Sequence, residues 1–244
     1  MIPIGDHLRT RSFPFVNYGL IIANFAAFFY ELTLSTHVQA VIVRGFVHAE
    51  APPRDLWIET WGLIPRQLSD FVNAPSTHDW QVLERLITSQ FIHAGWLHIL
   101  GNMLFLWVFG DNVEDALGHL RYLLFYLLCG VIAALTQVFF DRNALGPLVG
   151  ASGAIAGVLG SYLVLYPGAR VSVIIPIVII PFFANVAAVW VMLIWFLTQI
   201  ISLAPTANAT GGTGGVAYAA HIGGFIAGFV LVRLVATRRR SLPG

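Results

Sequence analysis

Apolar residues in this chain come in long blocks separated by shorter polar connections. The blocks predict membrane spans at about residues 15–34, 86 or 96 to 109, 120–140, 152–166, 185–203 and 216–236. A membrane helix needs roughly 20 mostly apolar residues to cross about 30 Å of hydrocarbon. The pattern therefore predicts an all-α polytopic membrane protein, a bundle of six transmembrane helices in one domain over residues 15–236.

Three blocks have unusual boundaries. The second is expected to stop at Gly110-Asp111-Asn112. The fourth is short, since its fifteen residues rise only about 22 Å, so a helix starting at Ser152 would begin about 8 Å inside the hydrocarbon. The fifth follows a longer apolar run that Pro176 and Pro181 interrupt, and for that reason it is placed at residues 185–203.

Composition agrees with a bilayer as the solvent. The chain is 57% hydrophobic and 10% charged, with a mean hydropathy of +0.78, whereas soluble domains carry about 25% charged residues. A net charge of +1 indicates no nucleic-acid partner. Cys129 is the single cysteine, which excludes an intrachain disulfide.

Arginine placement predicts the orientation. With six spans, the arginines nearest the span ends fall on one side, which the positive-inside tendency assigns to the cytoplasm; they are Arg9, Arg11, Arg121, Arg170 and Arg233. Residues 1–14 and the basic tail 237–244 are then cytoplasmic, and the polar connection 35–85 is outside. Its Trp and Leu residues suggest a partly folded segment at the membrane surface. No cleavable signal peptide is recognised, and a bacterial inner membrane is the expected location.

Polar side chains inside spans are costly and by default mark function. His98 and Asn102 in the second span, Ser152 in the fourth and His221 in the sixth all fall in the outer half of the predicted membrane. A serine needs a neighbouring base to become a nucleophile, and histidine titrates near neutrality. Small residues four apart let membrane helices approach closely, and both spans have such pairs: Gly153 with Gly157, and Gly224 with Gly228.

An oxyanion needs hydrogen-bond donors. His98 and Asn102 are four residues apart on one helix face, and the Ser152 backbone N–H at a helix start is a further donor. No Asp or Glu follows Asp141, so the pattern predicts a Ser–His dyad rather than a Ser–His–Asp triad.

Simpler interpretations exist for each residue. Ser152 could be only a helix N-cap, and His98 only a structural hydrogen-bonding group. His93 is interpreted as an interfacial residue, and Asp111, Glu114 and Asp115 as helix caps and interface charges. No spacing brings three metal ligands together, so neither a metal nor a cofactor is expected.

Three motifs resemble rhomboid intramembrane serine proteases: Gly150-Ala-Ser-Gly-Ala-Ile-Ala-Gly157, His93-Ala-Gly-Trp-Leu-His98-Ile-Leu-Gly-Asn102 and Ala220-His221-Ile-Gly-Gly224-Phe-Ile-Ala-Gly228. The resemblance implies that Ser152 is the nucleophile and His221 the base, and that His98, Asn102 and the Ser152 N–H form the oxyanion hole. It also implies that transmembrane protein substrates are cleaved near their outer ends without a cofactor. Entry would be lateral, by the second and fifth spans, under a cap formed by residues 204–215.

One departure concerns the base. Some family members carry an aromatic residue four positions after the serine, and here that residue is Ala156. His221 must then be held by another group, such as Tyr218 or a neighbouring span. Two other function classes are a non-catalytic relative that binds membrane helices, and a small transporter. The presence of both Ser152 and His221 argues against the first, and the lack of repeats and of acidic residues in the spans argues against the second.

Overall fold

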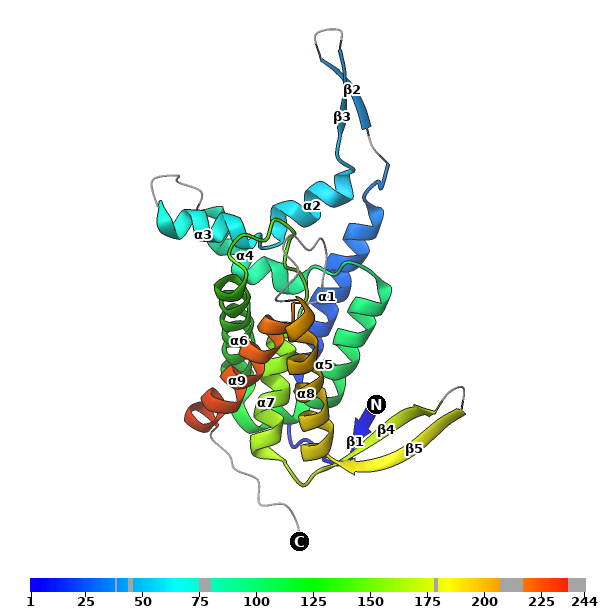
Figure 1. Cartoon of the computed structure of the whole chain (residues 1–244). Coiled ribbons are helices and arrows are strands. Elements are labelled where there is room, and N and C mark those ends of the chain that lie inside the picture. Colours follow the sequence, from blue (N-terminus) through cyan, green and yellow to red (C-terminus); the bar gives the residue numbers. More distant parts are fainter. Residues whose placement is uncertain (38, 44–45, 75–79, 178–179, 207–216, 237–244) are drawn as a thin grey trace.

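The computed structural model describes the whole chain except residues 38, 44–45, 75–79, 178–179, 207–216 and 237–244. Most of the predicted cap loop and the predicted basic tail therefore lie outside the described residues. The described chain is mainly helical (Figure 1).

Six apolar helices correspond to the six predicted spans. Three are long and apolar enough to cross a membrane alone: α1 (Phe15–Thr33), α6 (His119–Phe140) and α9 (Tyr218–Val235). A fourth candidate is α5 (Trp96–Leu117) together with the helical segment before it, from which it is bent by 81°. The other two have shorter apolar stretches: α7 (Ser152–Leu165), and α8 (Ala188–Thr206), in which the stretch runs from Ala188 to Leu203. The prediction of a polytopic helical membrane protein is confirmed, and the second helix begins at the later of the two predicted starts.

The all-α prediction missed a small sheet. Strands β1 (Ile2–Asp6), β4 (Arg170–Ile177) and β5 (Ile180–Ala187) form an antiparallel sheet in the order β1-β4-β5. Asn185, the predicted start of the fifth span, lies in β5, where its Oδ1 accepts a hydrogen bond from Ser172 Oγ at 2.8 Å. The prolines prevent a helix here, while the many Val and Ile residues favour strands.

The N-terminal strand is bonded to the bundle through the half-buried carboxylate of Asp6. Asn112 Nδ2 donates to Asp6 Oδ2 at 2.9 Å, and the Tyr162 hydroxyl donates to the same oxygen. Burial nevertheless raises the pKa of Asp6. β1 thereby connects the sheet to both α5 and α7.

The predicted stop at Gly110 is wrong. α5 continues to Leu117 and ends before Gly118, which has a φ of +83°. A Cβ on Gly110 would lie 2.0 Å from Asn17 Oδ1 and 2.6 Å from the Tyr122 hydroxyl. Gly110 is therefore a packing position where α1 and α6 approach α5. The carboxylate of Glu114 accepts hydrogen bonds from the Val16 and Asn17 backbone N–H groups, as expected of a helix cap.

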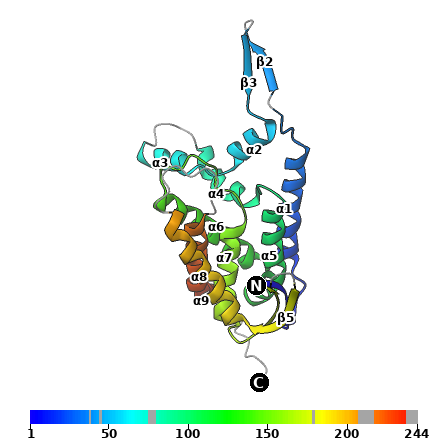
Figure 2. The same cartoon turned by 45° about the vertical axis from the view of Figure 1, so that its right-hand side comes forward.

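The connection between α1 and α5 is folded, as the sequence suggested. It contains a hairpin of β2 (Gln39–Val43) and β3 (Phe46–Glu50), followed by α2 (Pro53–Trp61), α3 (Pro65–Asn73) and α4 (Gln81–Thr88). The hairpin points away from the bundle in both views (Figures 1 and 2).

The prediction that the spans lack acidic residues is wrong, because Glu31 lies in α1 and is fully buried. Arg54 of α2 pairs with it, donating from Nε at 2.9 Å and from an Nη at 2.7 Å. The ion pair joins α2 to the end of α1, so this buried acid has a charged partner.

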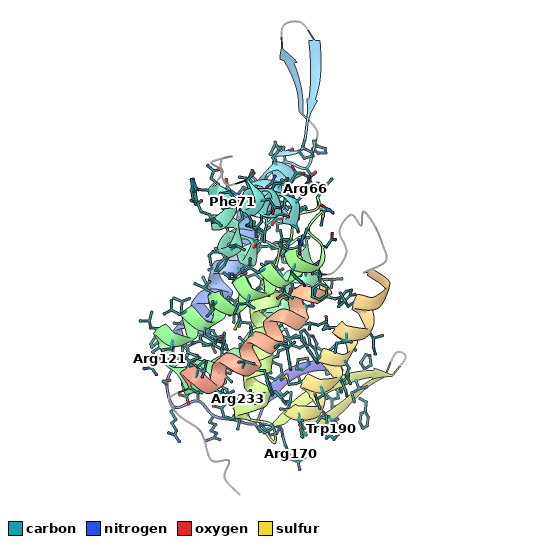
Figure 3. The ribbon with its side chains drawn as sticks, turned by 60° about the vertical axis from the view of Figure 1, so that its left-hand side comes forward. Arg66, Phe71, Arg121, Arg170, Trp190 and Arg233 are labelled. Atoms are coloured by element: carbon teal, nitrogen blue, oxygen red, sulfur yellow. The ribbon has the colours of Figure 1, made fainter. Side chains whose placement is uncertain are left out.

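The bundle has two distinct ends (Figure 3). One end, called the sheet end below, carries the β1-β4-β5 sheet, and Arg121, Arg170 and Arg233 lie toward it. The other, called the loop end, carries α2 and α3 with Arg66 and Phe71.

The short helix α7 forms the centre of the bundle. Ten of its residues in succession, from Gly153 to Tyr162, are buried. It has 14 residues against 22 in α6, which makes it about 12 Å shorter. A Cβ on Gly153 would lie 2.6 Å from the Cβ of Ala133, seven positions before α6 ends at the loop end. α7 therefore begins inside the bundle rather than at its surface.

Candidate active site

Ser152 and His221 are in direct contact. Ser152 is the first residue of α7, and its Oγ lies 2.7 Å from His221 Nε2 in α9. Both side chains are half-buried. The N-cap position of α7 is Ala151, and no side chain caps the helix, so the Ser152 hydroxyl is not an N-cap. It is instead directed at the imidazole.

Glycine pairs let the backbones of α7 and α9 come into direct contact. A Cβ on Gly224 would lie 2.1 Å from the Gly153 carbonyl oxygen, and one on Gly228 would lie 1.9 Å from the Gly157 oxygen. In the opposite direction, a Cβ on Gly160 would lie 2.1 Å from the Phe225 oxygen. Real Cβ atoms do not approach oxygen this closely, so only glycine fits at these positions. This parallel contact sets the Ser152–His221 distance.

Gly150 places the segment before Ser152 against the two candidate oxyanion donors. Its φ is +118°, and a Cβ there would lie 2.6 Å from His98 Nε2 and 3.6 Å from Asn102 Nδ2. His98 and Asn102 therefore lie beside the chain only two residues before the serine. Their side-chain nitrogens thus lie close to the start of α7, where the first N–H groups of a helix have no partner within the helix.

The folded connection between α1 and α5 holds this segment in place. Gly150 N–H donates to the Ser89 carbonyl at 2.8 Å, and Leu148 and Leu63 exchange two backbone hydrogen bonds of 2.7 and 3.1 Å. The segment that follows α2 therefore has a role at the site: it fixes the backbone that leads to Ser152.

Replacing Gly150 with alanine is expected to lower activity by roughly 100-fold while reducing stability by only about 1–2 kcal/mol, because a positive φ and a clash with His98 both displace the candidate oxyanion donors. Cleavage rate and melting temperature of the purified variant measure the two effects. The matched control is Gly101→Ala, next to Asn102, where a Cβ meets nothing within 4 Å. Wild-type cleavage by the Gly150 variant would contradict the prediction.

His93 is fully buried within the protein and belongs to the surroundings of the site. Its Nε2 accepts a hydrogen bond from Asn102 Nδ2 at 2.9 Å. Its ring also packs edge-on against His98, with centroids 5.0 Å apart. One N–H of the Asn102 amide is thereby fixed, and the second is left for the site. The sequence contained a sign of this contact, because His93 is a third polar side chain within ten residues of His98 and Asn102.

The structure shows which groups hold His221, given that position 156 is alanine rather than an aromatic residue. His221 Nδ1 lies 2.8 Å from Gln199 Oε1 of α8. The Trp195 ring, also from α8, lies 5.9 Å from the imidazole at a tilt of 37°, and the Tyr218 ring is 6.4 Å away, edge-on. A neighbouring span thus supplies the nearest support. Gln199 was not singled out from the sequence, although a buried amide in an apolar helix is the expected signal.

Among the described residues, no group of three or more His, Cys, Asp or Glu side chains could hold a metal ion.

Comparison with known proteins identifies the family. The family model described as the Rhomboid domain matches residues 80–238. The chain is 31% identical over 150 residues to Rhomboid protein 1, mitochondrial, of Saccharomyces cerevisiae, an alignment covering 59% of this chain and 39% of that protein. It is 40% identical over 81 residues to Rhomboid-like protein 11, chloroplastic, of Arabidopsis thaliana, covering 33% and 28% of the two chains.

A third relative is bacterial. The chain is 40% identical over 79 residues to Rhomboid protease GluP of Bacillus subtilis, covering 32% of this chain and 15% of that protein. The chain thus spans well under half the length of these relatives. Because the family model matches more than half of this chain, including Ser152 and His221, the protein belongs to the rhomboid family.

Proposed function

We propose that this protein is an intramembrane serine endopeptidase with Ser152 as nucleophile and His221 as general base. The observation that carries the proposal is the 2.7 Å contact between Ser152 Oγ and His221 Nε2, at the start of a helix that begins inside the bundle. Family membership supports protease activity, and one relative is named a protease. A non-catalytic relative has no need of this contact.

The reaction would proceed by acyl transfer. His221 Nε2 accepts the hydroxyl proton as Ser152 Oγ bonds to the scissile carbonyl carbon, and the carbonyl oxygen becomes an oxyanion. The same proton then passes to the leaving amine as the peptide C–N bond breaks. Water, deprotonated by His221, releases the new carboxyl end and restores the serine hydroxyl.

His98, Asn102 and the Ser152 backbone N–H are the proposed oxyanion donors. Their support is the position of Gly150, against which His98 Nε2 and Asn102 Nδ2 both lie. His93 keeps the Asn102 amide in one orientation, so the donor is preorganised before the negative charge forms.

The proposed substrates are transmembrane segments of proteins in the same lipid bilayer, cleaved by the six-span domain over residues 15–236. We propose a bacterial inner membrane in which the sheet end faces the cytoplasm. The arginines at the sheet end support this orientation, because positive residues near span ends favour the cytoplasmic side (Figure 3). Residues 1–14 and 237–244 would then be cytoplasmic, and Ser152 would open to the outer side.

A fluorophosphonate probe tests the proposal. With purified protein in liposomes, the probe is expected to form one covalent adduct, mapped to Ser152 by mass spectrometry, and to abolish cleavage of a model transmembrane substrate in proportion to labelling. Heat-denatured protein is the control and is expected to remain unlabelled. Cleavage that continues after complete labelling would show that Ser152 is not the nucleophile.

A further inference from the structure

We propose that Gln199 is a positioning residue that holds His221 in the tautomer required of a base, so that the site is a Ser152–His221–Gln199 triad with a neutral third member. The inference rests on the proposed function and adds a residue to it. Its basis is a continuous chain of hydrogen bonds from α8 through α9 to α7.

The orientation of the Gln199 amide is determined by its other contacts. Its Nε2 lies 3.2 Å from the Trp195 carbonyl oxygen, which can only accept a hydrogen bond. Its Nε2 also lies 3.1 Å from Thr198 Oγ1, whose own hydroxyl donates to the Trp195 carbonyl at 2.6 Å. Both neighbours therefore accept from the amide nitrogen. The amide oxygen must then be the atom that faces His221.

The amide oxygen in turn determines the proton on His221. An amide oxygen can only accept, so the 2.8 Å contact requires a proton on His221 Nδ1. In neutral imidazole the other nitrogen, Nε2, then carries a lone pair. This is the nitrogen 2.7 Å from Ser152 Oγ, and a lone pair there is what the serine proton requires. The reverse tautomer would present an N–H to the serine and could not act as base.

Burial increases the energetic importance of the hydrogen bond between Gln199 and His221. Gln199 is 9% exposed, and an amide so far from water keeps its hydrogen bonds because losing one is costly. The Trp195 ring adds a second restraint by packing beside the imidazole at 5.9 Å. α8 therefore supplies both the hydrogen-bond acceptor and an aromatic neighbour of His221.

A neutral acceptor suits this location. A carboxylate here would have to be desolvated inside the bundle, whereas an amide carries no charge to desolvate. The amide fixes the tautomer but stabilises the imidazolium less than a carboxylate would. Because Gln199 belongs to α8 while the dyad belongs to α7 and α9, the base is oriented only when α8 is packed against α9.

Two variants of Gln199 test the inference against a structural role. Gln199→Leu removes the acceptor and is expected to lower kcat roughly 10- to 100-fold with KM nearly unchanged, since the loss affects proton transfer. Gln199→Glu restores an acceptor and is expected to recover most of kcat. Its carboxylate favours the protonated imidazole, so the acid limb of the pH–kcat profile should move to higher pH. The matched control is Gln137→Leu, which removes another glutamine bonded to α9, at the Ala220 N–H, and should leave the profile unchanged.

The outcomes separate the two proposals. If wild-type protein fails to cleave, or Ser152→Ala cleaves normally, the proposed function fails. If wild-type cleaves, Ser152→Ala does not, and Gln199→Leu keeps the wild-type kcat, the role of Gln199 is overturned while the function stands. If Gln199→Leu does not fold, the Gln199→Glu profile decides, because an unshifted acid limb contradicts the proposal.

Discussion

Replacing Ser152 with alanine is expected to abolish cleavage of a transmembrane substrate, with a loss of roughly 10⁴-fold or more. The variant lacks Ser152 Oγ, the proposed nucleophile, which lies 2.7 Å from His221 Nε2. Its fold should survive, because the hydroxyl does not cap α7 and alanine is a better helix former. Cleavage of a model substrate in liposomes and the melting temperature of the purified protein give the two measurements.

The matched control is Ser161→Ala in the same helix. The Ser161 hydroxyl is also buried, but it donates to the Val158 carbonyl, one turn away within α7. Its removal should cost at most about 1 kcal/mol and leave cleavage unchanged. A Ser152→Ala protein that cleaves at a comparable rate would contradict the proposed mechanism, and a control that loses activity equally would point to damage of α7 instead.

Replacing Gly228 with alanine is expected to destabilise the folded bundle by about 3 kcal/mol or more, and with it the active site. The added Cβ would lie 1.9 Å from the Gly157 carbonyl oxygen and 2.6 Å from the Gly157 Cα. Both are backbone atoms, so no flexible side chain can move aside, and α9 must separate from α7. That separation also lengthens the Ser152–His221 contact, so activity should fall along with stability.

Unfolding in detergent mixtures with increasing denaturing detergent measures the loss. The control is Gly19→Ala in α1, where an added Cβ meets nothing within 4 Å and should be neutral or slightly stabilising. If the Gly228 and Gly19 variants unfold at the same point, the close approach of α7 and α9 is not what holds the bundle together.

Much of the fold was predictable because span position is a local property. A long apolar block has to be helical in hydrocarbon whatever it packs against, so the six blocks located α1, α5, α6, α7, α8 and α9 to within a few residues at most ends. Local signals failed where packing outweighed them. Gly110 looked like a stop but is a contact with Asn17, and Asn185, the predicted start of the fifth span, instead lies in strand β5, which pairs with β4.

For the candidate site, the amino-acid pattern was enough to select candidate side chains, because Ser152, His221, His98 and Asn102 are polar residues at similar depth in apolar blocks. It also indicated that α7 and α9 touch, since glycines four apart form a smooth face. The contact of His93 with Asn102 and that of Gln199 with His221 became visible only in the folded bundle. Those partnerships depend on how each helix is rotated about its axis and which neighbour it meets. Rotation and neighbours are set by packing across the whole bundle, so no spacing within one segment reveals them.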